Sequence, residues 1–393
     1  MTWDASIPLP VLTHQQSALV VGLLAVLCYV GSLNGDFVFD DSEAVVNNDD
    51  VQLTTPVWKL FSHDFWGTRI TNNASHKSYR PLTVISFRWN VWLSDGKLEP
   101  FSFHLFNVIL HGINSVLLLS VYKLLLGVES PKLSLVAASL FALHPVHTES
   151  VSGWHSGESR LTVHIFCIYK YSSLSVCCKK GEYQCQLLEL LCTFVCFVGI
   201  AMLCKEQGIT IIVSKRFHFF LRNLNHNVEG FDQNKSLIQS SSLVNGLLYK
   251  GVKKNHRIQE PRSLIITISF IVIQVVNYNY LYSLNMWILL CPEWLCFDWS
   301  MGCIPPISTD EICIFSFFKF HGQIQDFIIA LLGIVIALAL LIIPFLPASN
   351  LVFRVGFVIA ERVLYLPSAG FCLLVALGVR RLSVFPHSKN VSR

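Results

Sequence analysis

The sequence predicts an all-α protein that crosses a membrane several times and carries a structured loop after its first crossing. Of its 393 residues, 53% are hydrophobic and only 14% are charged, and the mean hydropathy is +0.53. Soluble domains carry about 25% charged residues. The apolar residues are gathered in runs that are long enough to cross a bilayer as helices. These observations favour a polytopic membrane protein over a soluble globular one.

The charge and cysteine content argue against two other classes. The net charge is only +4 and no basic run is interleaved with aromatic residues, so we expect no nucleic-acid partner. The 13 cysteines lie mostly inside apolar segments, where we expect small buried hydrophobes rather than a disulfide framework. Cys291, Cys296 and Cys303 form a loose cluster, but no zinc-type spacing with histidines accompanies them.

Residues 1–33 are predicted to hold the N-terminus and the first span, which runs from Ser17 to Leu33. Residues 1–16 contain no Lys or Arg, so they lack the positive region of a secretory signal peptide. We therefore interpret the first apolar run as an uncleaved signal anchor.

A pair of adjacent carboxylates, Asp40 and Asp41, follows this span inside the predicted first loop, residues 34–101. Two interpretations stay open from position alone. The pair is a solvated turn that stops the helix, or it is a general base or a cation- or phosphate-handling pair at the membrane surface. In an extended segment the two side chains point in opposite directions, so one could face a hydroxyl substrate.

The rest of this loop is predicted to be ordered and to lie at the headgroup level. Thr55-Pro56 is typical of a helix start, and apolar residues follow at helical spacing as far as Phe65. A second segment opens at Arg80-Pro81 and carries Trp89 and Trp92. Asn73 begins a glycosylation sequon, which suits a luminal loop.

The spans within residues 102–213 are predicted at Ser102–Leu126, Leu133–Val151, Leu161–Cys178 and Leu187–Leu203. Lys123 and Lys132 flank the link between the first two of these spans and indicate its cytosolic side. Simple alternation then places the acidic pair, the segment beginning at His144 and the segment beginning at Lys205 on the opposite face.

The order of crossings is less regular after that point. Residues 214–262 form a polar insert in which Lys and Arg outnumber Asp and Glu, as in a cytosolic segment. Residues 263–379 form a C-terminal membrane region with spans at Ser263–Leu290 and Ile324–Leu346 and a weak one around Phe371–Val379, and residues 380–393 form a short basic tail. Two crossings are missing from the alternation, so the number of spans stays open at about seven to ten.

Several polar residues stand at the predicted ends of spans, and each has a structural and a functional interpretation. His144, His147 and Glu149 could hold a metal, but their spacing matches no zinc family and we favour a hydrogen-bonded helix end. The remaining residues form internal ion pairs, or they bind a lipid phosphate, for which Arg supplies a two-pronged donor; they are Lys205, Glu206, Arg354, Glu361 and Arg362.

Seven motifs together resemble the membrane half of the transmembrane and tetratricopeptide-repeat O-mannosyltransferases. The similarity covers about residues 17–151, 187–213 and 276–379. The motifs are Phe37–Ala44, Ser78–Thr83, His144–Glu149, Cys204–Thr210, Cys296–Cys303, Ile343–Asn350 and Ala360–Pro367.

This resemblance implies a GT-C-like glycosyltransferase membrane domain in the endoplasmic reticulum membrane, with its active site on the luminal face. It implies transfer of mannose from dolichyl-phosphate mannose to Ser or Thr of secretory-pathway or membrane proteins, cadherins especially. The donor is a substrate, and no cofactor or metal is expected. Asp40 or Asp41 would be the catalytic base, and by analogy with first-loop acids of GT-C enzymes we favour Asp41. Arg80, Lys205, Arg354 and Arg362 would bind the donor phosphate, and the pocket would include His144, His147, Glu149, Glu206, Glu361 and Tyr365.

The sequence departs from the family pattern in three places. Residues 154–160 stand where the family has a Gly-Arg-Ala-Asp motif, residues 214–262 do not match, and tetratricopeptide repeats are not found in the sequence. Two rival interpretations follow. The chain is a catalytically inactive membrane scaffold or regulator, or it is a transporter, for which inverted repeats and ionisable groups at mid-membrane are expected.

Overall fold

The computed structural model describes residues 7–38, 40–127, 130–152, 199–204, 261–292, 295, 324–351 and 359–388. Within these ranges the chain is mostly helical and forms no strand, and His63 and Arg69 form an isolated bridge. The expected all-α class is confirmed for this part of the chain. The predicted site residues Lys205, Glu206 and Arg354 lie outside it, as do the expected span Leu161–Cys178 and most of the polar insert.

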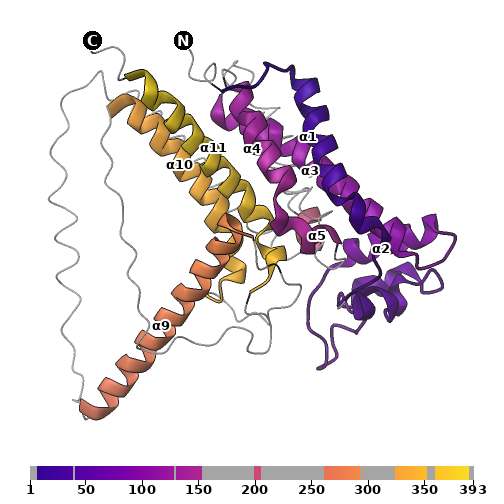
Figure 1. Ribbon diagram of the computed structural model, residues 1–393. Helices are drawn as coiled ribbons and strands as arrows, with labels where there is room; N and C mark the ends of the chain where they lie inside the picture. The colour runs from indigo at the N-terminus through magenta and orange to yellow at the C-terminus, as the bar shows by residue number, and fades with distance from the viewer. Residues whose placement is uncertain are drawn as a thin grey trace, which may run out of the picture.

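The helices form two groups that meet along one helix pair (Figure 1). The first group holds α1, α3 and α4, and the second holds α10 and α11, which run side by side. Packing of α11 against α4 joins the groups. The bounds are α1 His14–Tyr29, α3 Pro100–Leu126, α4 Pro131–Leu143, α10 Ile324–Phe345 and α11 Tyr365–Ser388. The first loop, with α2 (Pro81–Leu93), lies at the end of the bundle away from the N-terminus.

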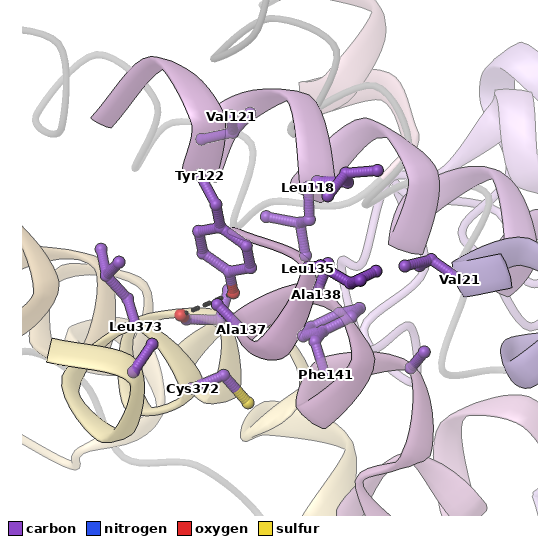
Figure 2. Packing of buried hydrophobic residues seen from close by; sticks show 14 of the residues in the cluster. Val21, Leu118, Val121, Tyr122, Leu135, Ala137, Ala138, Phe141, Cys372 and Leu373 are labelled. Carbon is purple, nitrogen blue, oxygen red and sulfur yellow. Dashed lines mark hydrogen bonds between the residues drawn. The ribbon is translucent and has the colours of Figure 1, made fainter. Parts of the chain in front are cut away.

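The bundle core is apolar and is crossed by a hydrogen bond between two helices. Tyr122 of α3 is fully buried, and its hydroxyl donates to the Ala369 carbonyl oxygen of α11 at 2.8 Å (Figure 2). Around it pack side chains from α1, α3, α4 and α11, including Val21, Leu118, Phe141 and Leu373. Burial of this apolar surface therefore fixes four helices against one another.

The helix α9 (Pro261–Leu290) meets the bundle near its own C-terminal end. Its Tyr282 hydroxyl donates to the Ser349 carbonyl oxygen at 2.8 Å, and the Tyr282 ring packs edge-on against Phe345. Ile288 and Leu289 join the apolar cluster that also holds Val363 and Leu364. The C-terminal end of α9 thus supports the segment that precedes α11.

Within the described residues, two helices are long and apolar enough to cross a membrane, His14–Asn34 and Pro100–Leu126. The first of these is α1 continued by the 3-10 helix η2 (Val30–Asn34), so the helix ends later than the α-helical part alone. Leu23 and Leu27 on it are 51% and 66% exposed, and Ile109 on α3 is 47% exposed. An apolar outer face of this kind suits contact with lipid, which supports a membrane protein.

The expected continuous span Leu133–Val151 is wrong, because the helix breaks at His144. Pro145 disfavours helical geometry in the residue before it, and His144 has extended torsion angles of φ −69° and ψ 121°. The chain continues as a 3-10 helix η6 (Pro145–His147) and the short α5 (Thr148–Ser152). The break turns the polar segment back against the rest of the bundle.

The first loop is ordered, as expected, and has its own apolar core, but only one of its two predicted helices forms as an α-helix. α2 begins at Pro81 and covers the second prediction. The first is a 3-10 helix, η5 (Val57–Ser62), which ends because Asp64 binds the following chain. The Asp64 carboxylate accepts hydrogen bonds from the backbone N–H groups of Trp66, Thr68 and His76 and from the Ser75 hydroxyl.

Gly370 is expected to be essential for the close approach of α10 and α11. A Cβ at Gly370 would lie 2.5 Å from the Ala337 carbonyl oxygen and would also meet the Leu341 amide nitrogen, both backbone atoms of α10. Gly370→Ala should therefore push the helices apart and lower the free energy of unfolding by about 1–3 kcal/mol. The measurement is thermal unfolding of the purified protein in detergent.

Gly378→Ala is the matched control, because a Cβ at this position of the same helix meets nothing within 4 Å. It should leave the melting temperature unchanged or raise it slightly through better helix propensity. Equal melting temperatures for Gly370→Ala and the parent would contradict this account of the helix contact.

Candidate functional site

The two predicted first-loop acids have different environments. Asp41 is fully buried and closes a turn with Val38. Its carboxylate accepts the Val38 N–H at 3.1 Å, while its own N–H donates to the Val38 carbonyl oxygen at 3.0 Å. The Asp41 side chain is therefore engaged in holding the backbone of the loop, as aspartates often are in turns.

Asp40 is presented outward by this turn. Its carbonyl oxygen accepts the N–H groups of Glu43 and Ala44, and a single π-helical turn, η3 (Ser42–Val46), follows. The side chain of Asp40 is 25% exposed. Single π turns are rare in proteins, and a large share of those that occur lie at functional sites. The local structure thus separates a structural carboxylate from an accessible one.

Arg362 brings together three segments that are far apart in the sequence. Its Nη1 lies 3.2 Å from Asp40 Oδ2, and its Nε lies 3.6 Å from Glu149 Oε1. The Arg362 backbone N–H also donates to Glu149 Oε2 at 2.8 Å. Glu149 on α5 therefore binds both the backbone and the side chain of Arg362, at the start of the 3-10 helix η10 (Glu361–Val363), where amide donors are otherwise unused.

Two carboxylates and one guanidinium meet at this junction. The two carboxylates of Asp40 and Glu149 face one guanidinium, and the three side chains are 25%, 10% and 20% exposed. Solvent or a ligand can therefore reach the Arg362 side of the junction. Such an arrangement can take a proton at a carboxylate and bind an anion at the guanidinium.

A buried hydrogen-bond network lies next to this junction. The His111 Nε2 donates to the Ala142 carbonyl oxygen at 3.1 Å, which leaves Nδ1 as the acceptor for the Tyr365 hydroxyl at 2.9 Å. The Asn114 amide also donates to the Tyr365 oxygen, at 3.2 Å. Because only Leu364 separates Tyr365 from η10, these bonds fix the segment that carries Arg362 onto α3.

The predicted pocket histidines serve the same junction. His144 Nδ1 accepts the Val146 N–H, so its Nε2 donates to the Leu289 carbonyl oxygen at 3.1 Å. Both ring nitrogens of His144 are thereby used, which leaves none for a metal. His147 Nε2 lies 2.8 Å from the Ser368 hydroxyl. Among the described residues no group of three or more His, Cys, Asp or Glu side chains is arranged to hold a metal ion.

Burial lowers the pKa of both histidines. The pKa of His147 is well below its ordinary value, first because the ring is desolvated and then because His111 and His144 lie beside it. Desolvation also lowers the pKa of His144. Both rings are therefore neutral hydrogen-bonding groups of the folded protein at neutral pH.

The other predicted residues lie around or away from the junction. Glu361 and Tyr365 are buried beside Arg362 in the chain. Arg80 precedes α2, with its guanidinium carbon 5.0 Å from the centre of the Phe65 ring, within the core of the first loop. Asn73 is exposed on the loop. Of the described predicted residues, the structure joins Asp40, Glu149 and Arg362 directly.

A polar stripe on α3 was missed at the sequence level. His104, Asn107, His111 and Asn114 are all buried and recur at helical spacing within an otherwise apolar helix. The signal was available, because polar residues on one face of a membrane span mark the face that packs against other helices. Ser368, one helical turn after Tyr365, is a further polar residue that the sequence analysis did not single out.

Comparison with known proteins gives a consistent result across the chain. A family model described as protein O-mannosyl-transferase TMTC, DUF1736, matches residues 265–315. Human protein O-mannosyl-transferase TMTC4 is 41% identical over 99% of this chain and 58% of its own length. Human protein O-mannosyl-transferase TMTC3 is 37% identical over 96% of this chain and 44% of its own length.

The similarity extends to invertebrates. A protein O-mannosyl-transferase of Caenorhabditis elegans is 35% identical over 95% of this chain and 52% of its own length. The chain thus spans about half the length of the curated relatives it matches. No solved structure matches it.

The neutral buried histidines predict a pH-dependent stability. The unfolded chain binds protons at these histidines below their ordinary pKa of 6.5, whereas the lowered pKa values make the folded protein bind fewer of them. The free energy of unfolding should therefore fall as the pH drops below about 6.5. Melting temperatures in detergent between pH 7.5 and 5 should decline, and the decline should be smaller for His147→Gln than for the parent.

The control is His14→Gln, which replaces an exposed histidine at the start of α1. Its pH profile should run parallel to that of the parent. If His147→Gln also runs parallel to the parent, protonation of this ring does not contribute to the loss of stability.

Proposed function

Because this chain belongs to the protein O-mannosyl-transferase TMTC family, we propose that it is the membrane part of a dolichyl-phosphate-mannose–protein mannosyltransferase. In this proposal it resides as a multi-pass, GT-C-like protein in the endoplasmic reticulum membrane. It transfers mannose to Ser or Thr hydroxyl groups of secretory-pathway proteins, cadherin-type acceptors among them. The names of its relatives support the reaction class, and the two long apolar helices support the membrane setting.

The observation that carries this proposal is the partly exposed carboxylate of Asp40 beside the Arg362 guanidinium. A hydroxyl is a poor nucleophile until a base within hydrogen-bond reach takes its proton. Asp40 is accessible for this task, whereas Asp41 is buried and binds the Val38 N–H. The geometry therefore favours Asp40 as the base, rather than Asp41, which analogy with other first-loop acids favoured.

Arg362 supplies the second requirement, a cation for the leaving group. The acceptor oxygen forms a bond to the mannose C1 while the bond from C1 to the phosphate oxygen breaks, and dolichyl phosphate leaves with the electron pair. The acceptor proton goes to Asp40. Positively charged side chains near the phosphate stabilise the negative charge that develops on it. Arg80, Lys205 and Arg354 are further candidates for this role.

A non-catalytic scaffold is the second candidate function. The same three side chains of Asp40, Glu149 and Arg362 form an internal ion-pair cluster, and such clusters also serve only to join segments. The two functions differ in what the loss of a single carboxylate does. A scaffold needs the ion pairs of Arg362 with the two carboxylates, whereas the enzyme needs a carboxylate at Asp40 that can accept a proton.

Asp40→Asn should abolish mannose transfer while the protein stays folded. An amide keeps the shape of the acid but cannot take the proton, and general-base help is worth about 10²–10⁴-fold in rate. The measurement is transfer of radiolabelled mannose from dolichyl-phosphate mannose to an acceptor by full-length protein, with the melting temperature recorded in parallel.

Asp41→Asn is the matched comparison in the same turn. It weakens the acceptor for the Val38 N–H and should lower the melting temperature, with transfer falling only as far as the folded fraction falls. Full transfer by Asp40→Asn would exclude this residue as the base, whereas no transfer by the folded parent protein would favour the scaffold.

The Asn73 sequon tests the orientation of the loop. Asn73 is exposed, so a luminal loop should carry a glycan there that endoglycosidase removes. Asn73→Gln should abolish the resulting mobility shift on a gel, and Asn72→Gln, next to it but outside the sequon, should preserve it. A chain that is never glycosylated at Asn73 in cells would argue against a luminal active site.

A further inference from the structure

The two groups that the proposed reaction needs are bound to each other in this structure. Asp40 would take the acceptor proton, and Arg362 would bind the donor phosphate, yet Asp40 Oδ2 lies 3.2 Å from Arg362 Nη1. A carboxylate bound to a guanidinium is a weaker base, because the charge that would attract the proton is already compensated. Asp40 therefore lies where the donor phosphate would contact Arg362, and Arg362 lies where the acceptor hydroxyl would contact Asp40.

The donor phosphate would compete with two carboxylates for Arg362. Arg362 already faces two carboxylates, Asp40 and Glu149. A phosphodiester brings a further negative charge close to both, which would repel it at these distances. Its binding to Arg362 becomes favourable when one carboxylate gives up its contact with the guanidinium.

The two carboxylates are bound to Arg362 in different ways. Glu149 is the less exposed of the two and is held by the Arg362 backbone N–H at 2.8 Å as well as by Nε, so it anchors the arginine. Asp40 contacts the guanidinium only through its side chain, which is 25% exposed. The backbone beside Asp40 is held independently, because Asp41 closes the turn with Val38.

We propose that the donor phosphate displaces Asp40 from Arg362, so that binding of the donor itself releases the base. This inference rests on the proposed function, since it assigns an order to the same reaction. Rotation of the Asp40 side chain exchanges one anion for another on a guanidinium that Glu149 keeps in place. Without the donor the base is masked, and the acceptor hydroxyl is activated only when mannose is present to receive it.

The test is equilibrium binding of dolichyl-phosphate mannose to the purified full-length protein in detergent, without acceptor. Asp40→Asn removes the competing charge, so it should bind the donor more tightly than the parent, by roughly fivefold. Glu43→Gln, which removes an exposed carboxylate in the same segment, should leave the affinity unchanged. Dolichyl phosphate without mannose should show the same gain, because the phosphate is the shared group.

A double-mutant cycle separates exchange at Arg362 from a general effect of charge. Arg362→Gln should weaken donor binding, and adding Asp40→Asn to it should bring no further gain. An unchanged affinity of Asp40→Asn, or a gain that persists in the Arg362→Gln background, would overturn the exchange. Absence of any donor binding by the parent protein would instead remove the proposed function on which it rests.

Discussion

The hydrogen bond between Tyr365 and His111 is the contact on which the arrangement of the site depends. Both side chains are fully buried in an apolar bundle, where an unpartnered polar group is costly. Because His111 is held by the Ala142 carbonyl oxygen, the tyrosine has one place to dock. This docking sets the start of α11, and with it the position of η10 and Arg362, against α3 and the end of α4.

The break at His144-Pro145 gives the charged residues their place. A helix continued through these residues would have carried Glu149 onward along the helix axis. The chain instead turns through η6 and begins α5, so that the Glu149 carboxylate meets the backbone and side chain of Arg362. His144 stabilises the turn from three sides, through Tyr29, Val146 and Leu289. The loss of helical hydrogen bonds is thus offset by side-chain hydrogen bonds.

The adjacent aspartates show how one short motif combines structure and chemistry. Asp41 faces the core of the turn and is fully buried, whereas Asp40 faces outward to Arg362. The two residues lie in a turn, where Asp41 has helical torsion angles, so the extended geometry expected from the sequence is not found and it is the turn that gives the two side chains different surroundings. A rigid Asp41 turn is what allows the Asp40 side chain to change partner without movement of the loop. The same division holds at Arg362, whose backbone is anchored while its guanidinium is accessible.

The sequence by itself determined the helical class, the positions of α2 and of the two long apolar helices, and the motifs that hold the site. These features depend on local composition and periodicity, which a single chain displays directly. It also placed Asp40, Glu149 and Arg362 among the candidates. Only the tertiary structure decided that these three meet, and that Asp41 and His144 are engaged in holding the fold. The partners of His144, Asp40 and Glu149 lie in distant segments, so the accessibility and charge of these groups depend on packing that no local pattern encodes.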